Sequence, residues 1–123
     1  MKTKLIELAK KVGFGAILMQ NVIYRAYPDL EPIRYYLWMC ELQKWCREKH
    51  QIYVTITQDF YVPGINFLYQ ILIYDPTDEY NCLDKRSSGL YGDNGEYGTY
   101  EQALEEGLYQ TLLLIQEENE RGN

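Results

Sequence analysis

The clearest hydrophobic pattern in the chain lies in residues 98–115. Thr99 has the side chain of a helix N-cap, and Gln102, three residues later, completes a capping box. Acidic residues fill the first two turns, where the helix dipole favours negative charge. One face carries apolar or small residues at helical spacing, namely Leu104, Leu108, Thr111, Leu112 and Ile115. We therefore expect an amphipathic helix whose apolar face needs a partner surface.

Two further segments have a helical pattern. Residues Lys2 to Val12 predict a short helix that Gly13 ends. Pro32 suits the first turn of a second helix that runs to about His50. Its main apolar stripe consists of Tyr35, Trp38, Met39, Leu42, Trp45 and Cys46. A second apolar face, formed by Tyr36, Leu37 and Cys40, indicates that this helix is covered on two sides.

The strand signals follow that helix. Residues 52–57 alternate, with Ile52, Val54 and Ile56 on one side and Tyr53, Thr55 and Thr57 on the other. A second strand is expected over about Phe67 to Tyr74, and a weaker third strand over Tyr80 to Asp84. The apolar segment from Ala16 to Tyr27 fits a helix or a strand equally well.

This order predicts the α+β class: a small antiparallel sheet of about three strands packed on helices, in the order α-α-β-β-(β)-α. We expect a single domain over residues 1–123, because the chain has no linker and no internal repeat. Residues 1–30 form an N-terminal helix and a variable segment, residues 31–117 the core, and residues 118–123 a frayed acidic tail.

The composition indicates a cytoplasmic protein. No uncharged run reaches the roughly 20 residues of a membrane span, so we expect no membrane partner. The three cysteines, Cys40, Cys46 and Cys82, are an odd and unpatterned set, which favours reduced thiols.

Charge is distributed unevenly along the chain. Residues 1–62 carry a net charge of +3 and residues 63–123 a net charge of −9. Proteins that bind nucleic acids usually present a basic surface, so we expect no nucleic-acid partner. The acidic half would instead attract a basic protein surface.

The sole histidine restricts enzymatic interpretations. Cys46 and His50 lie four residues apart, so one helix would bring them within reach of each other. They form a weak candidate Cys–His pair, or half a metal site if Cys82 joins them. The alternative is a packed cysteine and an exposed, charged histidine at the helix end. We expect no catalytic residue, no metal, no cofactor and no enzymatic activity.

The polar connection before the final helix is rich in glycine. Gly89, Gly92, Gly95 and Gly98 recur at every third position. The segment lacks the Lys-Ser/Thr pair of a phosphate-binding P-loop. A surface loop is therefore the simpler interpretation. A small ligand-binding domain that uses the Gly89–Gly98 loop is an alternative function.

Tyrosine is unusually frequent, with 13 residues in the chain. Tyrosine is enriched at protein interfaces because it offers a large amphipathic area at a small entropic cost. The candidate interaction surface consists of Tyr36, Tyr53, Tyr80, Tyr91, Tyr97 and Tyr100. The count predicts contact with a protein partner or a homodimer.

Two segments carry a resemblance to known proteins: residues 38–50, WMCELQKWCREKH, and residues 95–115, GEYGTYEQALEEGLYQTLLLI. Together they resemble small uncharacterised proteins carried by phages and prophages of gut Bacteroidales, over about residues 34–115. The closing segment is also similar to the final helix of HicB-type antitoxin domains. Neither resemblance implies catalytic residues.

The element order also resembles the double-stranded-RNA-binding fold. That fold needs lysines at the start of its final helix to contact phosphates. Here the position holds Thr99, Tyr100, Glu101 and Gln102. The resemblance therefore covers topology and does not extend to RNA binding.

These observations lead to one expected function and two alternatives. We expect a phage or prophage accessory protein that acts through protein–protein contact and associates with itself. The first alternative is an acidic inhibitor of a nucleic-acid-binding protein of the host, of the anti-defence type. The second is the ligand-binding domain described above.

Overall fold

The protein is described by a computed structural model, which covers residues 1–14, 31–59, 66–74, 82–84 and 97–122. The elements within these ranges are α1 (Lys2–Lys11), α3 (Glu31–His50), β1 (Ile52–Asp59), β2 (Asn66–Tyr74), β3 (Cys82–Asp84) and α4 (Tyr100–Arg121). The expected α+β class is confirmed, with helices packed against an antiparallel pair of strands. The ambiguous segment from Ala16 to Tyr27 lies outside the described residues.

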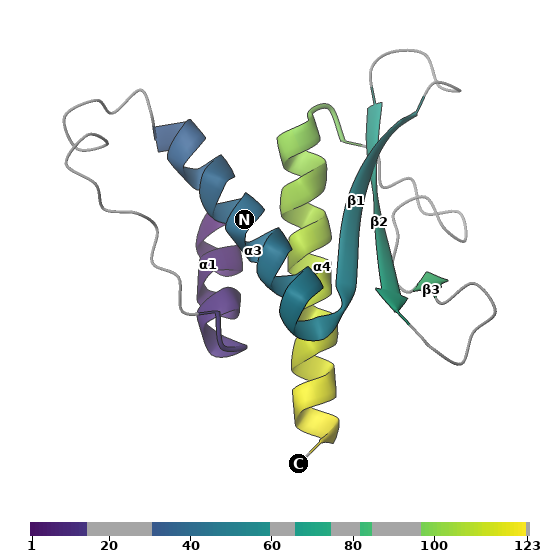
Figure 1. Cartoon of the computed structure of the whole chain (residues 1–123). Coiled ribbons are helices and arrows are strands. Elements are labelled where there is room, and N and C mark those ends of the chain that lie inside the picture. The colour runs from purple at the N-terminus through teal and green to yellow at the C-terminus, as the bar shows by residue number, and fades with distance from the viewer. Residues whose placement is uncertain (15–30, 60–65, 75–81, 85–96, 123) are drawn as a thin grey trace.

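Helix α4 occupies the middle of the molecule (Figure 1). It packs against β1 and β2 on one side and against α1 and α3 on the other. Its fully buried face consists of Ala103, Leu104, Gly107, Leu108, Thr111, Leu112 and Ile115. The apolar face predicted from the sequence is therefore the surface around which the layers assemble.

The N-terminus of α4 has the predicted cap. The Thr99 hydroxyl accepts a hydrogen bond of 3.1 Å from the backbone N–H of Gln102. The C-terminus differs from the expectation of a frayed tail over residues 118–123, because the helix continues to Arg121. Glu118 and Arg121 form an ion pair of 3.3 Å across this last turn, and Arg121 also places positive charge at the negative end of the helix dipole.

One glycine brings α4 unusually close to the sheet. A Cβ atom at Gly107 would lie 2.9 Å from Tyr69 Cβ and 3.0 Å from Val54 Cγ1. Real Cβ atoms essentially never approach so closely. The helix can therefore rest on β1 and β2 at this depth only because residue 107 has no side chain.

Strands β1 and β2 form the sheet against which α4 packs. They pair antiparallel in a register that runs from Ile52↔Ile73 to Asp59↔Asn66. The predicted alternation is confirmed. Residues Ile52, Val54 and Ile56 are buried or half-buried against the helices, whereas Tyr53, Thr55 and Thr57 are exposed on the opposite face.

The other edge of β2 carries two short pairings. Residues Cys82–Asp84 pair antiparallel with Leu72–Tyr74. Phe67 and Tyr97 form an isolated bridge with backbone hydrogen bonds of 2.8 Å and 3.0 Å. Tyr97 is thereby fixed beside the sheet two residues before the cap of α4.

Helix α3 lies on the same side of the sheet as α4 and contacts both α4 and β1. Its main stripe is the predicted one, with Trp38, Met39, Leu42 and Cys46 buried and Tyr35 and Trp45 half-buried. The Gln43 side chain donates a hydrogen bond of 2.6 Å to the carbonyl of Val54, on the edge of β1 that faces α3.

The chain passes from α3 to β1 through a single residue. Gln51 adopts a left-handed conformation with φ of 55°, and its N–H donates to the carbonyl of Arg47. This conformation ends the helix and turns the chain directly into the strand.

Helix α1 ends as predicted at Gly13, which has φ of 107°. The N–H of Gly13 donates to Lys10 and that of Phe14 to Ala9, which is the hydrogen-bond pattern of a Schellman motif. The Phe14 ring then packs against Trp38 and Trp45 with centroid distances of 5.7 Å and 5.5 Å. The C-terminus of α1 is therefore anchored on α3.

Candidate functional site

Cys46 and His50 occupy different environments although they lie on consecutive turns of α3. Cys46 is fully buried, and this burial raises the pKa of its thiol to about 12. The side chain is therefore a neutral thiol at physiological pH and lacks the thiolate that nucleophilic chemistry needs. Cys46 therefore fills a core position, as the hypothesis of a packed cysteine states.

His50 is half-buried, in contrast to the exposed and charged histidine of the alternative interpretation. Its ring lies edge-on to Trp45 at a centroid distance of 4.7 Å. The Nε2 atom is buried and has no hydrogen-bond partner in the described part of the chain. Burial, and then the charge of Lys49, lower the pKa of His50 below its ordinary value of 6.5. The direction of this shift is opposite to the effect of the helix dipole, which favours the charged form.

His50 should report this environment directly, because it is the only histidine. We expect its NMR titration to have a midpoint below 6.5 in the folded protein and close to 6.5 in urea. The unfolded chain binds the His50 proton more tightly than the folded chain does. The stabilisation of the fold that results from this difference is therefore fully present above pH 6.5. It is lost as the pH falls from there through the folded pKa.

The matched variant is His50→Gln. Its free energy of unfolding should lack the part of the pH dependence that lies just below pH 6.5. The carboxylates titrate similarly in both proteins, so the difference between the two stability curves isolates His50. A folded-state midpoint at or above 6.5 would contradict the burial of the ring.

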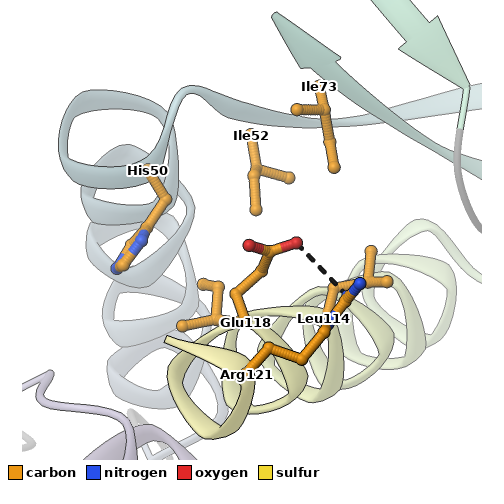
Figure 2. Close-up of a pocket in the computed structure, with 7 residues that line it drawn as sticks. His50, Ile52, Ile73, Leu114, Glu118 and Arg121 are labelled. Atoms are coloured by element: carbon orange, nitrogen blue, oxygen red, sulfur yellow. Dashed lines mark hydrogen bonds and ion pairs between the residues drawn. The ribbon is translucent and has the colours of Figure 1, made fainter. Parts of the chain in front are cut away.

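A hollow lies where α3, β1, β2 and the end of α4 meet (Figure 2). It has a volume of about 300 Å³. Its lining residues are His50, Ile52, Ile73, Leu114, Ile115, Glu118 and Arg121. In Figure 2, Ile52, Ile73 and Leu114 converge on the hollow, while the His50 ring is turned away from the Glu118 carboxylate.

The chemistry available in this hollow is limited. Its floor is aliphatic, and the Glu118–Arg121 ion pair at its rim is largely exposed, with both side chains 72% accessible. Exposed pairs of this kind contribute little energy and orient ligands weakly. His50 packs on Trp45 and does not face a second titratable group in the hollow. The arrangement suits an apolar contact better than acid–base catalysis.

The structure brings together part of the predicted tyrosine surface. The rings of Tyr36 and Tyr100 lie 6.4 Å apart, and Phe67 lies 6.3 Å from Tyr100. Tyr97 packs on Tyr69 at 6.0 Å. These side chains come from α3, α4, β2 and the segment before α4, so one end of the molecule is aromatic. We call Tyr36, Phe67, Tyr97 and Tyr100 the aromatic end.

The remaining predicted tyrosines are elsewhere. Tyr53 is 39% exposed and lies on the face of the sheet opposite the helices, because it alternates with the buried Ile52 and Val54. Tyr80 and Tyr91 lie outside the described residues, as do eight of the ten residues of the Gly89–Gly98 loop. The loop hypothesis therefore stays a prediction.

The helices beside the aromatic end are tied together by Tyr35. Its hydroxyl donates a hydrogen bond of 2.6 Å to the Glu105 carboxylate on α4. Its ring stacks on Trp38, and Lys2 Nζ of α1 lies 5.0 Å from its centroid. Burial, and then the bond to Glu105, raise the pKa of Tyr35, so it remains a hydrogen-bond donor at all ordinary pH values. This contact fixes the N-terminal halves of α3 and α4 relative to each other.

Two apolar residues that border this region were not among the predicted sites. Ile33 and Leu37 are 52% and 42% exposed, one turn apart on α3. The sequence did contain a signal, because Leu37 belongs to the second apolar face of this helix. That face was expected to be covered, but Ile33 and Leu37 are open to solvent.

Among the described residues, no group of three or more His, Cys, Asp or Glu side chains is arranged to hold a metal ion. In the same part of the chain, every helix is too short or too polar to span a membrane. Comparison of the chain with protein-family models, with curated proteins and with solved structures found no match.

Proposed function

We propose that the protein acts through protein–protein contact and associates with itself. The observation that carries this proposal is the convergence of exposed apolar side chains at one end of the molecule. Ile33, Leu37 and Tyr100 are all at least 36% exposed, and Tyr36 links the two helices that bear them. Apolar and aromatic side chains clustered in this way are typical of interaction surfaces.

The shape of this end supports the same proposal. A shallow hollow of about 180 Å³ lies between α3 and α4, lined in part by Tyr35, Tyr36 and Met39. Its rim carries the acidic side chains of Glu101 and Glu105. An apolar floor with a charged rim is the usual arrangement of a protein-binding surface. On the resemblance alone, we also propose that the contact serves a phage or prophage accessory role.

Sedimentation equilibrium over a range of protein concentrations tests self-association. We expect the weight-average mass to rise from the monomer value of 14.6 kDa towards twice that value. Apolar burial should make this rise persist at high salt, whereas a purely electrostatic association would be screened. A mass that stays at the monomer value up to the solubility limit at both low and high salt would contradict the proposal.

A double variant, Tyr36→Ser with Tyr100→Ser, would report whether the aromatic end takes part. It removes the ring contact between α3 and α4 together with exposed aromatic area. The matched control is Tyr53→Ser, which removes an equally exposed tyrosine from the opposite face of the sheet. We expect association to weaken in the double variant and to be unchanged in the control.

A further inference from the structure

The face of α3 turned away from the core has an apolar stripe of its own. Ile33 and Leu37 lie one turn apart and are exposed, and Cys40 continues the line while half-buried. Helical spacing places these three residues opposite Trp38 and Leu42, which are buried. We call Ile33, Leu37 and Cys40 the outward stripe. Its width suits the side of a second helix.

Two residues of opposite charge lie on one flank of the outward stripe, the half-buried Arg34 and the exposed Glu41. Arg34 lies three residues before Leu37 and Glu41 four residues after it, so the two are separated by two helical turns. They fall on the same flank of the stripe, because seven residues bring a helix back to nearly the same angle. The surface therefore shows basic, apolar and acidic positions in turn along one line.

Such a line of positions is complementary to the same line running in the opposite direction. When two α3 helices lie antiparallel about a two-fold axis near Leu37, Arg34 of each copy faces Glu41 of the other. The two Leu37 side chains then meet near the axis. An isologous interface needs this property, in which the same patch matches itself after rotation. An unrelated partner would not require opposite charges three and four residues to either side of one apolar residue.

We infer that the occupant of the outward stripe is a second copy of this chain, bound through an antiparallel pair of α3 helices. This inference rests on the proposed self-association and names the surface that forms it. The interface has Leu37 and Ile33 at its centre and two Arg34–Glu41 pairs at its rim. A helix of 20 residues is about 30 Å long, so a single helix pair gives a small interface and a concentration-dependent dimer.

The decisive experiment compares dimer dissociation constants, measured by sedimentation equilibrium, for the wild type and four variants. Leu37→Glu places a charge on the two-fold axis and should leave the chain monomeric where the wild type is dimeric. Arg34→Glu and Glu41→Arg should each weaken the dimer about 2- to 10-fold, because like charges then meet at the rim. The variant with both reversals restores opposite charges and should recover the wild-type constant.

Circular dichroism of each variant, recorded as a monomer, verifies that the fold is retained, and Tyr53→Ser serves as the control on the opposite face of the sheet. If the wild type is monomeric at every concentration, self-association itself is refuted, and this interface with it. If the wild type dimerises and all four variants dimerise equally well, self-association stands and this surface is wrong. If Leu37→Glu abolishes the dimer but the double reversal restores nothing, the antiparallel two-fold arrangement is overturned.

Discussion

Replacing Leu108 by alanine should lower the free energy of unfolding by about 2–5 kcal/mol. Leu108 is completely buried on the face of α4 that forms the centre of the core. The substitution removes the transfer energy of the deleted methyl and methylene groups and leaves a cavity between layers that cannot fully collapse. Urea unfolding followed by tryptophan fluorescence measures the change, and an unaltered slope with denaturant would show that the loss is one of stability.

The control for this measurement is Leu37→Ala, at a protein concentration low enough to keep the chain monomeric. Leu37 is 42% exposed, so its truncation should change the free energy of unfolding by less than about 0.5 kcal/mol. Equal effects at the two positions would mean that Leu108 is not a core residue and that the layer order is wrong.

Replacing Gly107 by alanine should destabilise the protein by about 1–3 kcal/mol, although alanine favours helix by about 1 kcal/mol over glycine. The new methyl group would lie 2.9 Å from Tyr69 Cβ, an atom attached directly to the backbone of β2. The strand cannot yield without disturbing its pairing with β1, and the helix cannot move away without loosening its packing on the sheet. Thermal and urea unfolding both measure the effect.

Two further variants test the steric cost. Gly98→Ala should be nearly neutral, because its Cβ would meet only Gln102 Oε1 at an ordinary distance of 3.7 Å. Val54→Ala removes the second close contact, at 3.0 Å, so it should cost less in the Gly107→Ala background than in the wild type. A Gly107→Ala protein more stable than the wild type would contradict the close approach of helix and sheet.

Features that depend on neighbouring residues could be predicted from the sequence. The Thr99 cap, the Gly13 stop and the alternation of Ile52 and Val54 each follow from a few adjacent side chains, and the structure has all three. The apolar face of α4 could likewise be predicted, because a single helix must bury such a face.

Features that depend on contacts between distant segments could not be predicted. The sequence shows only a glycine inside a helical pattern at position 107, because the role of Gly107 comes from Tyr69 and Val54 on other elements. His50 is half-buried where the sequence suggested an exposed side chain, because its burial depends on how the end of α3 packs. In each case the deciding neighbour is far away in sequence or set by the packing.

The candidate site shows the same division. A high tyrosine count indicated an interaction surface, but it could not tell that Tyr36 and Tyr100 meet whereas Tyr53 lies on another face. Leu37 belonged to the second apolar face predicted on α3, and only the packed structure shows that Leu37 and Ile33, one turn away, are exposed. Composition thus indicated the kind of surface, and topology decided its members.

The position of α4 in the chain has a consequence for synthesis on the ribosome. The elements that pack on this central helix, α1, α3, β1 and β2, all precede it in the order of translation. At about 5–20 residues per second, the 22 residues of α4 take roughly one to four seconds to be made. Throughout that interval Val54 and Tyr69, against which Gly107 of α4 packs in the finished fold, are not covered by α4. The nascent chain therefore passes through a period in which the apolar surface that α4 later covers is open to chaperones.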